Sequence, residues 1–390
     1  MKIALVQDEI VRRGGSEQVL LSFHNAFPEA PIYTLNYNAQ NSYPEFKQCN
    51  IKTSWFGRFI NTEKNLKRFF VPFGIMAMKQ LYLKDYDVVL QSTTHCAKYI
   101  KTDPRTIVIT YCHTPFRLVW NPDSYERVSN AGIIKRKLLN ILLKKLKDID
   151  EQSALRTNYF LTNSKEVVPR IQSAYNPLHS ITVINPSVKC DKFYISKSIG
   201  DYYLVVSRFE YYKKVDLVIE TFNKMPDRKL IVVGKGSREK ELKSIAGPNI
   251  TFLNGLSSAD LAKLYANCKA FIFPQLEDYG ITPLEANASG RPVIGYNKGG
   301  ILDTMIPLTD DPLKATAVLF NKQTVESLSE AIEIFETLDF DPLFIRKHAE
   351  TFDDECFVKK IRDFVFEKYQ MIHKDPVITI NPQSSIACGF

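Results

Sequence analysis

The sequence predicts an α/β protein built from two Rossmann-like domains, each with a parallel sheet. Three observations carry this prediction: short apolar strands alternate with amphipathic helices, glycine-containing turns join them, and the pattern restarts after residue 200. Strands that alternate with helices form a parallel sheet covered by helices on both faces. A length of 390 residues is also more typical of two domains than of one.

The first half opens with an apolar strand at residues 2–6 and a polar loop that ends in Gly14-Gly15. A helix is expected next, from about Ser16 to Phe27, because apolar residues recur there at helical spacing. Three later runs rich in β-branched residues predict further strands, at residues 87–90, 106–111 and 159–163.

The second half repeats this pattern. Strands are expected at residues 202–206, 229–234 and 270–273, and helices at residues 215–224 and 260–266. Between the two halves, residues 188–200 lack periodicity and mark the boundary. We therefore expect an N-terminal, acceptor-side domain at residues 1–195, a donor domain at residues 196–368 and a tail at residues 369–390, unstructured from Pro376 onward.

A short helix is predicted after Thr282-Pro283, because proline is favoured at the first helical position and Glu285 completes a Thr-x-x-Glu capping box. Gly290 is expected to end the helix in a left-handed conformation, before a strand that starts at Pro292. The free N–H groups at the start of this helix, those of Gly280 and its neighbours, would favour an anion such as a phosphate.

Composition narrows the class of protein. The seven cysteines are scattered without a Cys-x-x-Cys pair, so they predict neither a zinc site nor a disulfide framework. No apolar stretch is long enough to span a bilayer, and the first residues do not resemble a signal peptide. A cytoplasmic location is the simplest expectation. No strand is followed by the Gly-x-Gly-x-x-Gly fingerprint with its acidic partner, which disfavours a nicotinamide enzyme.

The net charge of +8 belongs to the first half. Residues 1–195 contain 27 Lys and Arg against 16 Asp and Glu, or +11, whereas residues 196–390 contain 24 against 27, or −3. Residues 133–147 carry six cations and no acid among leucines at helical spacing, and residues 58–70 mix cations with aromatic side chains. A basic amphipathic helix of this kind favours an anionic membrane surface over nucleic acid, with Lys144, Lys145 and Lys147 as the predicted contacts.

The segment Glu277-x7-Glu285, preceded by Phe-Ile-Phe-Pro and followed by Ala-Ser-Gly-Arg-Pro-Val-Ile, resembles the donor-site signature of retaining glycosyltransferases of the GT-B fold, the group 1 family. The resemblance implies that two Rossmann-like domains face each other across a cleft. It also implies that Glu277 meets the hydroxyls of the transferred sugar and that Glu285 binds the nucleotide ribose. Tyr279, Gly280, Ile281 and Thr282, between the two glutamates, are expected to line the donor site as well.

Two further segments extend this resemblance. Arg208 and Lys213, five residues apart after a strand, resemble the family's Arg-x4-Lys element, which neutralises the leaving phosphate. Taken alone, the two charges are equally consistent with a solvated loop. Gly14-Gly15 resembles the family's Gly-Gly-x-Glu loop, which faces the donor, although a plain tight turn is the commoner use of such a pair. Lys235, in the turn after the next strand, is expected to flank the base.

The segment Tyr-Cys-His113-Thr-Pro-Phe-Arg117 resembles the His-Thr-Pro-Met-Arg segment of mannosyl-type members, with phenylalanine in place of methionine. A lone histidine is more often structural, but the resemblance places His113 beside the transferred sugar, where it would stabilise developing positive charge or position hydroxyls rather than act as a base. Ser16, Arg117 and Asn163 are expected on the acceptor side. A helix-capping role for Asn163 is the simpler alternative.

The sequence thus predicts a retaining glycosyltransferase that needs neither a cofactor nor a metal ion. Its expected partners are a nucleotide sugar, most simply GDP-mannose, a lipid-linked glycan or oligosaccharide acceptor of surface polysaccharide synthesis such as O-antigen or capsule, and the inner face of the cell membrane, but not nucleic acid. Three alternatives remain open: a UDP-sugar transferase of the same fold, a non-transferring GT-B epimerase, and a non-catalytic subunit that binds sugar nucleotide at the membrane.

Overall fold

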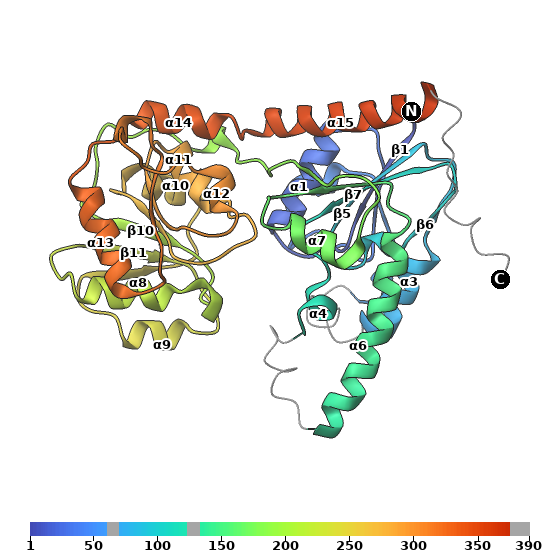
Figure 1. Ribbon diagram of the computed structural model, residues 1–390, viewed down its shortest axis with the longest axis horizontal. Coiled ribbons are helices and arrows are strands. Elements are labelled where there is room, and N and C mark those ends of the chain that lie inside the picture. The colour runs from blue at the N-terminus through green and yellow to red at the C-terminus, as the bar shows by residue number, and fades with distance from the viewer. Residues whose placement is uncertain (61–69, 123–132, 375–390) are drawn as a thin grey trace, which may run out of the picture.

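The computed structural model describes residues 1–60, 70–122 and 133–374. Within these residues the chain forms two main parallel sheets with helices on their faces, one sheet from each half of the sequence (Figure 1). The predicted α/β class with parallel sheets is confirmed. The expected unstructured tail after Pro376 and most of the basic aromatic stretch at residues 58–70 lie outside the described residues.

The first sheet has seven strands in the order β3-β2-β1-β5-β7-β8-β9, all parallel. Its strands are β1 (Ile3–Gln7), β2 (Ile32–Thr34), β3 (Ile51–Thr53), β5 (Val88–Thr93), β7 (Ile107–Cys112), β8 (Tyr159–Thr162) and β9 (Thr182–Val183). The helices of this half are α1 (Gly15–Ala26), α3 (Ile75–Gln80), α4 (Arg117–Trp120), α6 (Ile133–Ala154) and α7 (Val168–Tyr175). A separate pair, β4 (Tyr82–Leu83) and β6 (Lys101–Thr102), lies beside the main sheet.

The central strands β1, β5 and β7 are buried along their whole length. Burial of both faces of a strand is what a parallel sheet covered by helices on each side produces. The sequence predicted these three strands but missed β2 and β3. Each of the latter has only three residues, which is too short for a periodicity to be recognised.

The second sheet has six parallel strands in the order β12-β11-β10-β13-β14-β15. They are β10 (Tyr203–Val206), β11 (Leu230–Val233), β12 (Ile250–Leu253), β13 (Phe271–Phe273), β14 (Val293–Tyr296) and β15 (Ala317–Phe320). Around it lie α8 (Val215–Asn223), α9 (Glu239–Ser244), α10 (Ser258–Asn267), α11 (Thr282–Ala288), α12 (Ile301–Thr304), α13 (Val325–Glu336) and α14 (Pro342–Glu350). The strands and helices predicted for this half are therefore present, with ends shifted by one or two residues.

The last helix, α15 (Asp354–Lys374), returns to the first half and lies across its sheet (Figure 1). Phe357, Ile361 and Val365 enter the core formed by α1 and the first sheet, and the ring of Phe357 stacks on that of Phe23 at 6.1 Å. The assignment of everything up to residue 368 to the second domain does not match this packing. Helical structure also continues to Lys374, past the expected start of the tail at residue 369.

Candidate active site

The predicted site residues follow the carboxyl ends of strands in both sheets, the edge where open parallel sheets bind ligands. The two halves meet there. A Cβ placed on Gly15, in the first half, would lie 3.6 Å from Cδ1 of Ile281 in the second. Between the same halves, the Arg117 guanidinium donates to a carboxylate oxygen of Asp278 at 2.6 Å. The structure therefore brings together the loop of Gly14-Gly15 and the loop between β13 and α11, residues 274–281, which is called the Glu277 loop below.

Lys213 and Glu277 form an ion pair within the second half. Lys213 lies in a short 3-10 turn, Tyr211–Lys213, and is 9% exposed, whereas Glu277 belongs to the loop that follows β13. Burial lowers the pKa of Lys213 to about 7, and the guanidinium groups of Arg208 and Arg117 act in the same direction. The Asp278 carboxylate opposes this shift, and so does the carboxylate of Glu277, which contacts the amine. Lys213, which is predicted to bind the diphosphate, thus contacts Glu277, which is predicted to bind the sugar.

Arg208 is exposed at the start of the same loop and donates to the Tyr212 hydroxyl at 2.6 Å. The turn that carries Lys235 packs directly against this loop. The N–H of Phe209 donates to the Lys235 carbonyl at 3.1 Å, and a Cβ on Gly236 would lie 2.5 Å from the Phe209 carbonyl oxygen. Glycine is therefore needed for the two loops to approach, and their approach places the exposed Lys235 beside the Arg208 loop.

Helix α11 starts at Thr282, and Gly290 adopts a φ of +68° just after its end, as predicted. The predicted capping box is wrong. Ile281 precedes the helix without a side-chain cap, and the Glu285 carboxylate accepts a hydrogen bond from the Tyr265 hydroxyl at 2.7 Å. Tyr265 is fully buried and needs an acceptor for its hydroxyl, so it recruits Glu285. Burial raises the pKa of Glu285.

Tyr279 is buried, and its hydroxyl donates to the Pro186 carbonyl at 2.6 Å. Its side chain therefore ties the Glu277 loop to the segment that joins the two halves. Because the side chain is engaged in this way, only the backbone of Tyr279 remains for the predicted contact with the donor. Gly280 follows at a φ of +91°, where a Cβ would lie 2.7 Å from Cζ of Phe273. Only glycine fits this turn without strain.

His113 follows β7 and is partly exposed. Its Nε2 lies 2.9 Å from the Ser92 hydroxyl, and burial lowers the pKa of its imidazole to about 4. The ring is therefore neutral at pH 7, which agrees with a role in positioning hydroxyls. The Asn163 amide donates to the His113 carbonyl at 3.3 Å. The alternative capping role for Asn163 is wrong, because α7 begins only at Val168.

On the first loop, Gly14 precedes α1 in an extended conformation and Ser16 donates to the carboxylate of Glu17 at 3.0 Å. Glu17 is 1% exposed, and burial raises its pKa to about 7. The candidate residues did not include this acid, although it occupies the glutamate position of the Gly-Gly-x-Glu motif. That motif was the signal that could have found it.

A second missed group lies at the end of β1. The donor atoms of Asp8, His95 and Cys96 lie within 4.8 Å of one another, close enough to hold a metal ion. The carboxylate and the imidazole already have partners, however. The Asp8 carboxylate accepts from the Thr93 hydroxyl at 2.9 Å, from the Cys96 N–H at 2.8 Å and from Nδ1 of His95 at 3.1 Å. The Asp8 carboxylate raises the pKa of His95, so the group is better described as a buried ion pair.

The basic helix α6 extends away from the first sheet (Figure 1). Lys144 and Lys145 are exposed beside Ile141 and Leu142, two large apolar side chains that are 59% and 40% exposed. Lys147 differs, because its amine lies 4.5 Å from the Trp120 ring centroid and 3.9 Å from the Glu151 carboxylate. The structure thus places all three predicted lysines on one helix, but Lys147 also has a packing role.

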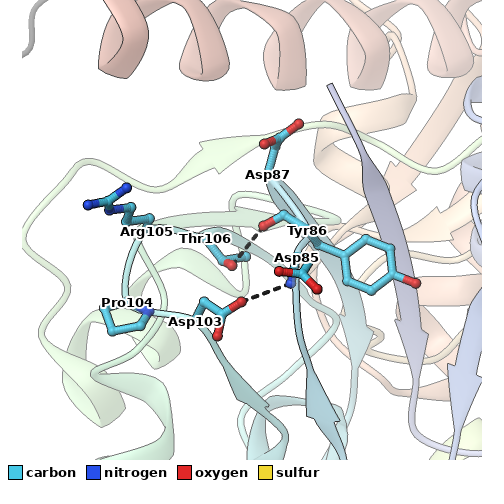
Figure 2. Close-up of a pocket in the computed structure, with 7 residues that line it drawn as sticks. All are labelled: Asp85, Tyr86, Asp87, Asp103, Pro104, Arg105 and Thr106. Carbon is cyan, nitrogen blue, oxygen red and sulfur yellow. Dashed lines mark hydrogen bonds between the residues drawn. The ribbon is translucent and has the colours of Figure 1, made fainter.

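A hollow at the opposite edge of the first sheet is lined by residues 85–87 and 103–106 (Figure 2). Asp87 and Thr106 directly precede β5 and β7, so this is the amino edge of the sheet. Hydrogen bonds within its own wall tie it together: Asp103 accepts from the Asp85 N–H, and the Thr106 hydroxyl donates to the Tyr86 carbonyl, both at 2.8 Å. The predicted donor residues lie at the other edge, so this hollow is not the donor site.

Known proteins with similar sequences include glycosyltransferases. Residues 195–351 match the model of "Glycosyl transferases group 1". Among curated relatives, the alpha-1,3/1,6-mannosyltransferase ALG2 of Candida glabrata is 24% identical over 94% of this chain and 92% of its own length. The O-antigen chain mannosyltransferase RfbU of Salmonella typhimurium is 28% identical over 57% of this chain and 59% of its own length.

Solved structures share the fold. A sucrose-phosphate synthase from Thermosynechococcus elongatus superposes with a TM-score of 0.70 at 14% identity, over 95% of this chain and all of that one. Anabaena Alr3699/HepE in complex with UDP gives a TM-score of 0.67 at 16% identity, over 94% of this chain and all of that one. These likenesses agree with one another: the chain has the GT-B fold, its residues 195–351 resemble the group 1 glycosyl transferases, and its curated mannosyltransferase relatives support a glycosyltransferase activity.

Proposed function

We propose that the protein is a retaining, metal-independent mannosyltransferase that moves mannose from GDP-mannose to a lipid-linked or oligosaccharide acceptor in surface polysaccharide synthesis. The observation that carries the proposal is the pair formed by Lys213 and Glu277 beside Arg208, at the junction with the half that holds His113. Mannosyltransferases among the relatives support the choice of sugar. Support for the pathway comes from RfbU, which is named for the O-antigen chain, and not from the ALG2 relatives.

In this proposal the nucleoside diphosphate leaves toward Arg208 and Lys213, whose positive charges stabilise the developing charge on the phosphate in place of a metal ion. Glu277 holds hydroxyls of the transferred sugar and keeps Lys213 protonated. The acceptor hydroxyl attacks from the side on which the diphosphate leaves, which retains the anomeric configuration. The neutral imidazole of His113 either accepts a hydrogen bond from a sugar hydroxyl or donates one to it.

A panel of nucleotides tests the choice of donor. If the protein uses GDP-mannose, GDP should raise the unfolding temperature more than UDP or ADP at equal concentration, because a ligand that binds only the native state stabilises it in proportion to its affinity. Incubation with GDP-mannose and lipid-linked acceptors should then yield product. A larger shift with UDP, together with transfer from UDP-glucose, would establish the alternative transferase.

The remaining alternatives are separated by product analysis. An epimerase would convert the nucleotide sugar without an acceptor. A binding subunit would bind nucleotide without turnover in the wild type or in any variant. Under the proposal, Glu277→Ala, Lys213→Ala and His113→Ala each abolish transfer, and the anomeric configuration of the product, read by NMR, equals that of the donor.

We further propose that the protein associates peripherally with the inner face of the cell membrane through α6. The support is the exposed pair Lys144 and Lys145 next to the exposed Ile141 and Leu142, since cations and apolar side chains on one helix suit an anionic leaflet. None of the helices in the described residues is long and apolar enough to cross a bilayer. Contact with the surface would bring a lipid-linked acceptor to the acceptor side.

Charge reversal tests this contact. The double variant Lys144→Glu/Lys145→Glu should bind vesicles containing anionic lipid at least about 30-fold more weakly, because each lysine near such a surface contributes about 1 kcal/mol. Lys147 is left in place, since its packing on Trp120 would confuse the result.

The matched control for charge is Lys240→Glu/Lys263→Glu, which reverses two exposed lysines of the second half. Co-sedimentation with vesicles measures binding, and the unfolding temperature of both variants should equal that of the wild type. Equal loss of binding in the two variants would attribute the effect to net charge rather than to α6.

A further inference from the structure

Asp278, the residue next to Glu277, is held by two arginines from the other half of the molecule. One carboxylate oxygen accepts from Arg117 at 2.6 Å and the other accepts from Arg170 at 2.5 Å. Arg117 belongs to α4 and Arg170 to α7, so the two guanidinium groups come from different helices. Glu166 holds Arg170 in place by an ion pair of 2.7 Å. Both carboxylate oxygens of Asp278, a residue of the second half, are therefore held by side chains of the first half.

The backbone around Asp278 is fixed as well. The Ser164 hydroxyl, in the first half, donates to the Asp278 carbonyl. On the other side, the Glu277 carbonyl accepts from the N–H of Gly300 at 2.9 Å, a contact within the second half. The Glu277 loop is thus anchored to its own half at residue 277 and to the other half at residue 278.

We infer that Asp278 is a positioning residue: it clamps the Glu277 loop against α4 and α7, and so sets the placement of Glu277 relative to His113. His113 and Arg117 lie on the same loop and helix of the first half, only four residues apart. The contact between Arg117 and Asp278 therefore also fixes the position of His113 relative to Glu277. The Asp278 side chain is 16% exposed, whereas those of Arg117 and Arg170 are 53% and 38% exposed, so water screens these ion pairs in part. This inference rests on the proposed function of Glu277 and His113.

Asp278→Asn tests the clamp with little change in shape. The amide keeps one acceptor, but its NH2 group faces a guanidinium and cannot accept from it. We expect kcat/KM for the nucleotide sugar to fall on the order of 10- to 100-fold, the loss that a small misplacement of reacting groups causes. The Kd for the nucleoside diphosphate, measured at pH 6 because the Asp278 charge also raises the pKa of Lys213, should change by less than about twofold, since Arg208 and Lys213 keep their positions. Hydrogen exchange at residues 276–281 should become faster.

Asp201→Asn is the matched control. Asp201 also bridges two cations, Lys229 at 3.4 Å and Lys269 at 2.7 Å, but all three residues belong to the second half. This variant should leave kcat/KM, nucleotide affinity and exchange at residues 276–281 unchanged. The double variant Arg117→Gln/Arg170→Gln should reproduce the loss seen in Asp278→Asn. Adding Asp278→Asn to it should cause no further loss, because residues that act as one unit are not additive.

Unchanged kcat/KM and unchanged exchange in Asp278→Asn would overturn the inference. A parallel loss of nucleotide affinity would overturn it too, because Asp278 would then act on the donor site itself. If the wild type transfers no sugar from any donor, the proposed function fails, and the clamp is still decided by exchange: faster exchange at an unchanged unfolding temperature supports it, and unchanged exchange refutes it.

Discussion

Glu277→Gln is expected to lower kcat on the order of 100- to 1000-fold while the protein stays folded. The amide can still hydrogen-bond to a sugar hydroxyl, but it carries no charge, and loss of one preorganised electrostatic contact has effects of this size. The substitution also removes the partner of the buried Lys213 amine. Without this partner the protonated form of the Lys213 amine is less stable, so the leaving phosphate is neutralised less well.

Initial rates with the nucleotide sugar and acceptor measure this effect, and the unfolding temperature shows whether the fold is kept. Glu220→Gln is the control, because Glu220 is an exposed carboxylate on α8. It should retain the wild-type rate. A Glu277→Gln variant with more than about a tenth of the wild-type kcat would remove Glu277 from the reaction.

The rate should also fall with rising pH earlier than an ordinary lysine would allow. Burial and the neighbouring arginines lower the pKa of Lys213 to about 7 from an ordinary value of 10.5; Asp278 opposes this shift, and so does the Glu277 carboxylate in contact with the amine. Neutralising the leaving phosphate requires the protonated amine. We therefore expect kcat/KM for the donor to decline between pH 7 and 10.5, and the decline to begin at lower pH in Glu277→Gln.

The sign of the effect on folding is opposite. Between pH 7 and 10.5 the unfolded chain binds more protons at Lys213 than the folded chain does, so this residue makes unfolding less favourable as the pH rises. Lys213→Met should thus be more stable than the wild type below pH 7, although it is inactive. Chemical denaturation at pH 6 measures this difference. An equal or lower free energy of unfolding for the variant would show that Glu277 fully compensates the buried charge.

The sequence predicted the fold well because parallel strands buried on both faces are long apolar runs. β1 and β7, which are buried along their whole length and apolar over most of it, are clear examples. The donor loops were predicted for a different reason: Arg208, Lys213 and Glu277 stand at fixed spacings in local segments that resemble a known family. The role of a residue within one strand-loop-helix unit can be inferred from the local sequence, without knowing which other segments pack against that unit.

Contacts between distant segments were missed for the opposite reason. Glu285 was expected to cap its own helix, but it serves Tyr265, twenty residues away. Asp278 was passed over because an acid in a loop has no local signal, whereas its partners, Arg117 and Arg170, lie more than 100 residues away in the sequence. Such partners are fixed by tertiary packing, which no periodicity of the chain encodes.

The return of α15 to the first sheet has a consequence for how the chain folds during synthesis. Residues 1–183 supply every strand of that sheet, yet Phe357, Ile361 and Val365, which cover part of its core, are translated only after the whole second sheet. While the ribosome makes the second half, the apolar face of α1 remains without its final cover, an exposure that favours aggregation. The first half is therefore a discontinuous folding unit that closes only when the last helix leaves the ribosome.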